Sequence, residues 1–454
     1  MQKHLYSLTI CFLISLFIPQ TVQAQSNTSL GQQALQSNTT GTENTALGMD
    51  ALRNNTTGRD NTATGKGALA NNKGDFNVAD GAGALMFSTG TYDNTAVGTE
   101  ALSLDSFGCC NTATGSLALF SNGIGFWNTA VGYQALMSNT GGPEYDGSGN
   151  TAIGNMALFS NTTGHGNVAN GISALFCNGT ASNSTACGNS ALYSNTTGQS
   201  NTAIGVWALE ANTSGDENTA VGRLSLESIT TGTRNTAIGT DSGAFYNNTH
   251  STFIGAGAAA YVPSGVSNST GLGSGADITA DNQVRIGNPF VTSIGGQVNF
   301  TAFSDSRYKK NIREDVPGLE FIGKLRPITY TVDVEKLDTK LSSMRPQSHV
   351  DSSIALKPHK RSTEESKASD EKASIVYTGF AAEEVEQAAK ELKYQFSGVD
   401  APKNKDDFYG LRYAEFVVPL VKSVQELRAE NQELKKELTE LRHMVTKLRK
   451  TEPH

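Results

Sequence analysis

Apolar and small residues recur along the first half of the chain at a fixed spacing, much longer than a helical turn or a strand alternation. The unit reads Asn-Thr-Ala-aliphatic-Gly, followed three residues later by Ala-Leu. Thirteen copies start at residues 27, 44, 61, 77, 94, 111, 128, 150, 167, 184, 201, 218 and 235, so the usual step is 17 residues. The fifth position is Gly in every copy, and the ninth is Leu in 12. Such a period predicts a solenoid, in which each unit buries its apolar residues against its neighbours.

The residue types in the repeat favour β-structure over helices. Gly and the β-branched residues Thr, Val and Ile are poor helix formers, and helical repeats are longer than about 30 residues. We therefore predict a parallel β-solenoid head over residues 25–250, with two short strands per coil, for example residues 128–131 and a strand around residues 135–136. Asn-Thr-Thr-Gly segments such as residues 161–164 are expected to form turns, because Gly can adopt positive φ there.

Stacking of similar coils places equivalent residues above one another. The ninth-position leucines are then expected to form a buried column, and the first-position asparagines a hydrogen-bonded ladder. One step of 22 residues, between the copies at 128 and 150, carries an insertion around residues 143–147.

Charge density changes sharply near residue 300. Residues 25–303 carry 24 charged side chains in 279 positions, whereas residues 304–454 carry 53 in 151. We therefore place a domain boundary there, with residues 251–303 as the end of the head and a transition. The formal net charge of −8 argues against a nucleic-acid partner, because the chain has no excess of cations to neutralise phosphates.

The N-terminal residues have the pattern of a secretory signal peptide. Lys3 precedes an apolar run over residues 5–18, and a Val-Gln-Ala sequence ends at Ala24. A charged start, a short apolar run and small residues before the cleavage point are typical of such signals. We expect residues 1–24 to be removed, the protein to be secreted or displayed at the cell surface, and the mature chain to have no membrane-spanning helix.

The repeats offer little catalytic or metal-binding chemistry. Calcium-binding glycine-rich repeats need Asp in every copy, whereas Asp here is sporadic, as at Asp80, Asp146 and Asp241, so we expect no metal and no cofactor. No carboxylate pair recurs at the spacing that glycoside hydrolysis requires. None of the four cysteines beyond residue 24 has the paired spacing of a zinc site. Trp127 and Trp207 are compatible with a ligand patch, although ordinary packing is the simpler interpretation.

The C-terminal residues carry the heptad pattern of a coiled coil. Residues 412–450 are expected to be helical, with Pro419 near the start, and their core positions are spaced alternately by four and three: Leu420, Val424, Leu427, Asn431, Leu434, Leu438, Leu441, Val445 and Leu448. This pattern predicts a coiled coil over residues 420–450, whose register a core asparagine fixes with some loss of stability. The heptads alone favour two strands, and a single helix packed on its own domain is the alternative.

Two resemblances to known families extend this interpretation. The Asn-Thr-Ala-aliphatic-Gly units resemble the head repeats of trimeric autotransporter adhesins, whose heads are trimeric parallel β-rolls with a shorter period. Four later segments, residues 304–312, 325–330, 379–385 and 411–416, occur in this order before the coiled coil. These segments, in this order, resemble the intramolecular chaperone domain of phage tailspikes and endosialidases. That family is trimeric and consists of self-cleaving serine peptidases with a Ser-Lys dyad.

The second resemblance implies a chaperone and autoprocessing domain over residues 304–419. Residues 336–374 depart from the family pattern, and their polar, aperiodic composition predicts a disordered insertion. Matched residue by residue, the family's nucleophile falls on Ser304 and its base on Lys309. Ser304 would attack the carbonyl of the Phe303–Ser304 bond, and hydrolysis of the ester or acyl intermediate would release the head.

Lysine chemistry sets the conditions for such a dyad. A serine hydroxyl needs a base, and lysine acts as one only when burial or nearby cations favour its neutral form. Arg307 and Lys310 are the nearby cations, and Lys310 is the second candidate for the base. The spacing alone is unspecific, because Ser and Lys five positions apart are common on solvated turns.

These patterns predict an exported, fibre-like homotrimer of the surface or adhesin type, whose C-terminal domain drives trimer folding and then cuts itself off. The alternative is an uncleaved structural or adhesive trimer, in which the C-terminal domain is only an oligomerisation clamp. A cell-surface or glycan ligand for the head is compatible with both.

Overall fold

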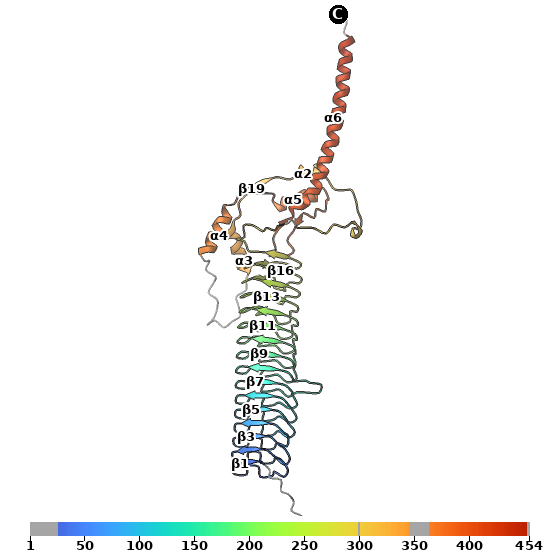
Figure 1. Cartoon of the computed structure of the whole chain (residues 1–454). Coiled ribbons are helices and arrows are strands. Elements are labelled where there is room, and N and C mark those ends of the chain that lie inside the picture. The colour runs from blue at the N-terminus through green and yellow to red at the C-terminus, as the bar shows by residue number, and fades with distance from the viewer. Residues whose placement is uncertain (1–25, 298–299, 345–362, 452–454) are drawn as a thin grey trace, which may run out of the picture. The chain divides into compact units, whose positions relative to one another are not determined.

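The computed structural model describes residues 26–297, 300–344 and 363–451 (Figure 1). The predicted signal peptide, residues 1–24, lies outside the described residues. The chain divides into two compact units, Met1–Ala276 and Asp277–His454. The division falls within residues 251–303, which the sequence assigns to the end of the head and the transition.

The first unit is a parallel β-solenoid built from one short strand in each coil. Fifteen strands follow one another in a single sheet: β1 (Thr28–Leu30), β2 (Thr45–Leu47), β3 (Thr62–Thr64), β4 (Val78–Asp80), β5 (Thr95–Val97), β6 (Thr112–Thr114), β7 (Thr129–Val131), β8 (Thr151–Ile153), β9 (Val168–Asn170), β10 (Thr185–Cys187), β11 (Thr202–Ile204), β12 (Thr219–Val221), β13 (Thr236–Ile238), β14 (Thr252–Ile254) and β16 (Thr270–Leu272). A two-residue strand, β15 (Ala259–Ala260), lies outside this series. The predicted solenoid is confirmed, and it continues beyond residue 250 through β14 and β16.

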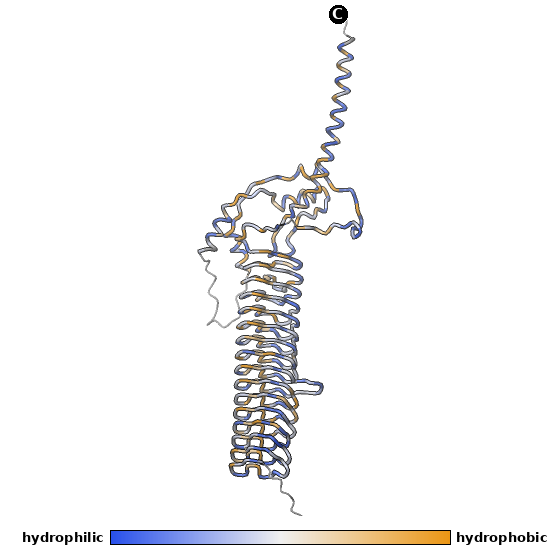
Figure 2. Tube along the Cα trace, viewed as in Figure 1, coloured by the Kyte–Doolittle hydropathy of each residue, from blue (hydrophilic) through white to orange (hydrophobic). Residues whose placement is uncertain are grey.

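The register keeps equivalent residues of successive coils aligned. Ala46 pairs with Ala63, and Ala130 pairs with Ala152 across the 22-residue step, so the insertion does not shift the register. Figure 2 shows apolar positions recurring from coil to coil along the solenoid. The ninth-position leucines form the expected buried column: Leu52, Leu69, Leu85, Leu102, Leu119, Leu136, Leu158, Leu175, Leu192, Leu209 and Leu226 are fully buried.

The first-position asparagines form the expected ladder. The Asn61 Oδ1 accepts hydrogen bonds from the backbone N and the Nδ2 of Asn77, at 3.0 and 3.2 Å. The Asn218 Oδ1 accepts the same pair of bonds from Asn235, both at 3.0 Å. Because these amides are fully buried, the ladder satisfies polar groups that would otherwise destabilise the interior of the coil.

The prediction of a second strand in each coil is wrong. The Ala-Leu segment is a turn, in which Leu136 has a φ of 52° and its N–H donates to the carbonyl of Ala157 in the next coil at 2.9 Å. A strand would send neighbouring side chains to opposite faces, but Ala135 and Leu136 are both fully buried. The left-handed conformation turns both inward, and burial of the leucine, about 2 kcal/mol, offsets a backbone strain of about 1 kcal/mol.

The invariant glycine at the fifth position follows from close stacking of the coils. Gly132 has a φ of 138°, and a Cβ atom there would collide with the carbonyl group of Gly154 in the next coil. Only glycine meets both conditions, which explains why this position never varies among the 13 copies.

A second ladder of buried amides contains one carboxylate. The Asp105 Oδ1 accepts hydrogen bonds from the backbone N–H of Gly108 and from Nδ2 of Asn122, at 2.9 and 3.1 Å. In the next coil the Asn122 Nδ2 donates to the carbonyl of Gly125, at 2.9 Å. The other carboxylate oxygen of Asp105, Oδ2, is buried and accepts no hydrogen bond from the described residues. Burial raises the pKa of Asp105 to about 7, while its two hydrogen bonds oppose the shift.

Replacing Asp105 with asparagine should stabilise the solenoid at neutral and alkaline pH. The raised pKa means that the folded chain holds a proton which the unfolded chain releases above about pH 4. The carboxyl group's contribution to stability is therefore present at low pH and is lost as pH rises toward 7. We expect Asp105→Asn to raise the free energy of unfolding at pH 8 by roughly 4 kcal/mol and to have little effect at pH 4. Thermal melting at both pH values tests this, with the exposed Asp93→Asn as a control. Equal effects of the two substitutions would contradict it.

The second unit mixes short strands and helices and ends in a long helix. Its elements are β17 (Asp277–Ile278), β18 (Val284–Ile286), η1 (Ser306–Tyr308), α2 (Leu319–Ile322), β19 (Ile328–Tyr330), α3 (Val334–Met344), α4 (Thr363–Ser374), β20 (Tyr377–Gly379), α5 (Ala382–Glu391), β21 (Val399–Asp400), β22 (Gly410–Leu411), η2 (Tyr413–Phe416) and α6 (Val417–Thr451). β19 pairs with β20, and β21 with β22, both antiparallel. The core contains Phe321, Val385, Ala388, Ala389 and Phe416.

The predicted disordered insertion, residues 336–374, differs from what the structure describes. Its two ends are helical, in α3 and α4, and residues 345–362 between them lie outside the described residues. In α3 an apolar residue recurs at helical spacing, so Val334 and Leu341 are buried and Leu337 is half-buried. This stripe stabilises a helix that the overall polar composition does not suggest.

The heptad residues of α6 are exposed in the single chain. Leu434, Leu438 and Leu441 are 61%, 50% and 56% exposed, although each is an apolar side chain on the same seam. None of the helices within the described ranges has both the length and the apolar character needed to cross a membrane.

Candidate processing site

The predicted nucleophile and base lie at the two ends of one tight turn. Asp305 caps the short helix η1, because its carboxylate accepts a hydrogen bond from the backbone N–H of Arg307 at 2.9 Å. At the other end the backbone N–H of Lys309 donates to the carbonyl of Ser306 at 3.1 Å. This local structure returns the Lys309 side chain to Ser304.

The structure brings the two sequence candidates into direct contact. The Lys309 Nζ donates a hydrogen bond to the Ser304 Oγ, and the two atoms are 2.9 Å apart. This separation is within the range needed for proton transfer between a nucleophile and its base. Lys310, the second candidate for the base, makes no hydrogen bond to Ser304 within the described part of the chain.

An ion pair lies beside this contact. The Arg307 guanidinium binds the Asp305 Oδ2 through Nη2 and Nε, at 2.6 and 2.9 Å. The hydrogen bonds from Arg307 lower the pKa of Asp305, and the bond to Asp305 raises the pKa of Arg307. Because Asp305 neutralises Arg307, this cation repels Lys309 less than the sequence suggests. Lys310, the neighbouring cation, forms no ion pair with any residue that the structure describes.

The site is open to solvent in the single chain. Ser304 and Lys309 are exposed, and Phe303, on the other side of the bond at which cleavage is predicted, is 79% exposed. The Phe303 ring contacts the ring of Tyr308, with centroids 5.6 Å apart. Water stabilises a charged amine, whereas a lysine base must be neutral. The geometry of a dyad is therefore present here without the burial that such chemistry needs.

The other three motif segments meet in the core of the second unit. Phe380 stacks on Phe416 with centroids 5.4 Å apart, and its backbone N–H donates to the Tyr413 hydroxyl at 3.3 Å. Arg326, from the second segment, forms an ion pair with Glu384 from the third. Segments far apart in sequence thus form one packed unit.

No family model, curated protein or solved structure matches the chain.

Sequence reasoning missed two features of possible sites. The first is the capping role of Asp305, which the Asp-Ser-Arg spacing could have indicated, since Asp is a favoured helix cap. The second is an aromatic hollow formed by Phe107, Phe126 and Tyr145, to which the 22-residue step and Trp127 were the pointers. The structure also places Trp127 beside this hollow, with its ring stacked on Tyr145.

Proposed function

We propose that this protein is an exported, fibre-like homotrimer of the surface or adhesin type, whose C-terminal domain assists trimer folding and then cleaves itself from the head. The observation that carries the proposal is the 2.9 Å contact between the Lys309 Nζ and the Ser304 Oγ. The order of the four motif segments, and the packing of three of them into one core, support the same conclusion.

The proposed reaction breaks the Phe303–Ser304 peptide bond. Neutral Lys309 accepts the proton of the Ser304 hydroxyl, and Oγ attacks the carbonyl carbon of Phe303. The peptide nitrogen of Ser304 leaves with a proton, so an ester replaces the amide. Water then hydrolyses the ester, which gives a carboxylate at Phe303 and a free amine and hydroxyl at Ser304.

Two exposed apolar stripes support self-association. The seam of α6 is one, and the fourth position of the repeat is the other. Val97, Val131, Ile153, Ile204 and Ile238 lie at this fourth position and are 36–43% exposed along the sheet. Thr114, Asn170 and Cys187 interrupt this row in the intervening coils. Exposed apolar side chains that recur in this way are candidates for an interaction site, and a second copy of the chain offers an equivalent stripe at the same spacing.

A C-terminal trimerisation domain solves a kinetic problem for the head. Stacked coils depend on contacts between distant residues and leave unpaired strand edges during folding, which is slow and exposes the chain to aggregation. Chains that first associate through α6 would set their number and register before the heads assemble. Removal of the domain afterwards would make the assembly irreversible.

An uncleaved trimer is the second candidate. The exposure of Ser304 and Lys309 favours it, because the proposed chemistry needs a buried base. In that case the domain acts only as a clamp, and the Ser304–Lys309 hydrogen bond stabilises the turn.

The purified full-length chain should separate the two candidates without any added protease. We expect two fragments on a denaturing gel after boiling and a slowly migrating oligomer without boiling. The smaller fragment should begin with the sequence Ser304-Asp305-Ser306-Arg307, because the reaction breaks the bond before Ser304. A single intact band that still forms an oligomer would support the clamp instead.

A further inference from the structure

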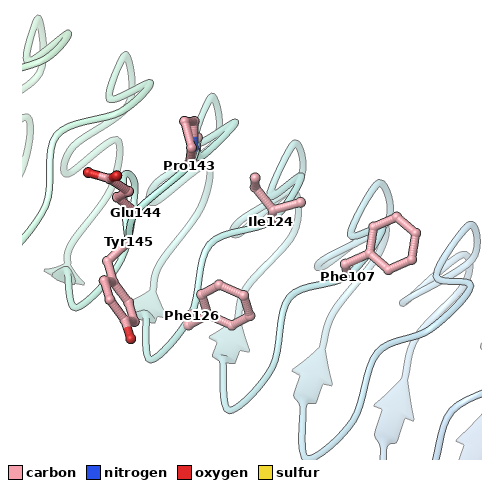
Figure 3. A pocket seen from close by; sticks show the side chains of 7 residues that line it. Phe107, Ile124, Phe126, Pro143, Glu144 and Tyr145 are labelled. Atoms are coloured by element: carbon pink, nitrogen blue, oxygen red, sulfur yellow. The ribbon is translucent and has the colours of Figure 1, made fainter.

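The insertion between β7 and β8 builds a hollow on the side of the solenoid (Figure 3). The hollow has a volume of about 610 Å³, and its lining includes Phe107, Ile124, Phe126, Pro143, Glu144 and Tyr145. Three successive coils therefore contribute to it. The segment that closes it projects from the solenoid at the level of β7 (Figure 1).

Hydrogen bonds hold the base of the insertion in place. The N–H groups of Gly141 and Gly147 donate to the carbonyls of Thr162 and Thr163 in the next coil, at 3.0 and 2.8 Å. On the other side, the N–H of Gly149 donates to the carbonyl of Phe126 at 2.9 Å. The insertion is thus attached to both neighbouring coils, and the hollow exists before any ligand binds.

Aromatic side chains around the hollow are largely exposed. Phe107 is 62% exposed and Tyr145 is 63% exposed. Trp127 is 57% exposed, and its ring stacks on that of Tyr145, with centroids 5.8 Å apart and planes at 16°. The Phe126 ring lies 6.1 Å from Trp127. Exposed aromatic clusters on soluble proteins mark binding sites.

The charges near the hollow are of one sign. Residues 74–222 contain no lysine or arginine, whereas Glu144 lines the hollow and Asp146 follows in the same insertion. A cation is attracted both to these carboxylates and to the faces of the aromatic rings. A saccharide would need several hydrogen-bonding side chains, but only Glu144 and Tyr145 supply such groups in the lining, and the other lining residues are apolar or glycine. The lining therefore suits an alkylated ammonium group.

We propose that this hollow binds a small soluble organic cation bearing a trimethylammonium group. Phe126 and Tyr145 supply aromatic faces, and Phe107 extends the apolar wall over the far coil. Glu144 adds negative charge at the edge of the hollow, with its carboxylate directed away from the phenylalanine rings (Figure 3). A flat bilayer surface would meet the projecting insertion before the hollow, which favours a free compound over a lipid head group. The site is independent of the processing reaction.

Titration of the full chain with choline tests this binding site. Trp127 is the reporter, and a Trp207→Phe background removes the fluorescence of the second tryptophan. We expect saturable binding of choline, and binding of its neutral isostere 3,3-dimethylbutan-1-ol that is at least about tenfold weaker. Phe126→Ala and Tyr145→Ala should each weaken choline binding about tenfold. Glu144→Gln should weaken choline but leave the neutral isostere unchanged.

Tyr133→Ala is the matched control, because Tyr133 is an exposed aromatic residue of the same coil that does not line the hollow. It should leave choline affinity unchanged. Unaltered circular dichroism and melting of each variant will show that the solenoid is intact. Equal binding of choline and the isostere, no binding of either, binding of methyl glucoside in place of choline, or binding only to phosphatidylcholine vesicles would each overturn the proposal.

Discussion

Replacing Ser304 with alanine should leave the chain in one piece. The substitution removes the only atom that can attack the Phe303 carbonyl in the proposed reaction, so we expect self-cleavage to fall by at least about a thousandfold. Ser304 is exposed and its side chain bonds only to Lys309 among the described residues, so the fold should not change. The measurement is the fraction of cleaved chain over time on a denaturing gel.

Lysine variants separate the base from its neighbour. Lys309→Ala should abolish cleavage as fully as the serine variant, whereas Lys310→Ala should retain most of it, because only Lys309 contacts the nucleophile. Ser306→Ala, an exposed serine in the same turn, is the control for the serine substitution. Continued cleavage at the same bond in Ser304→Ala would mean that an external protease cuts the chain, and the dyad assignment would then be wrong.

The repeat made the solenoid predictable, because equivalent positions in successive coils have the same structural environment. A residue that recurs at a fixed position, such as the Gly found in all 13 copies or the Leu found in 12, can be interpreted once and applied to every coil. The prediction of a second strand is wrong because the Ala-Leu segment lacks the alternation of a strand. Ala135 and Leu136 are adjacent and both apolar in nearly every coil, which a strand with one buried face does not allow. Leucine rarely adopts the left-handed backbone conformation, so its presence in the repeat does not suggest a turn at this position.

The two candidate sites differ in how much of each could be predicted from the sequence. The contact between Ser304 and Lys309 was predictable, because it spans five residues and a family resemblance singled out the pair. The aromatic hollow was not, since it joins Phe107 to Tyr145 across coils and depends on how the insertion folds back. In the sequence, the 22-residue step and Trp127 marked the place. The helical ends of the polar insertion were not predicted, because the apolar stripe of α3 is short and most residues around it are polar.

Disrupting the seam of α6 should abolish both trimer formation and cleavage. Leu434 is 61% exposed in the single chain, so its apolar surface has no role there and is available to partner chains. A proline at this position would break the helix, at a loss of about 3 kcal/mol or more per chain. If assembly is what buries Lys309, Leu434→Pro should also remain uncleaved although Ser304 and Lys309 are intact. Sedimentation velocity and a denaturing gel measure the two effects.

A second pair of variants distinguishes the apolar seam from helix formation. Leu434→Ala with Leu441→Ala keeps good helix formers but removes six leucines from a trimer, a loss on the order of 10 kcal/mol, so monomers should dominate and stay uncleaved. Glu433→Ala with Glu440→Ala alters adjacent exposed positions off the seam and should assemble and cleave normally, because exposed charges contribute little to stability. If the double leucine variant still sediments as a trimer, the chains associate elsewhere, and the fourth-position stripe of the head becomes the place to look. If it is monomeric but cleaves at the normal rate, burial of Lys309 does not depend on assembly, and the folded single chain must supply the base by itself.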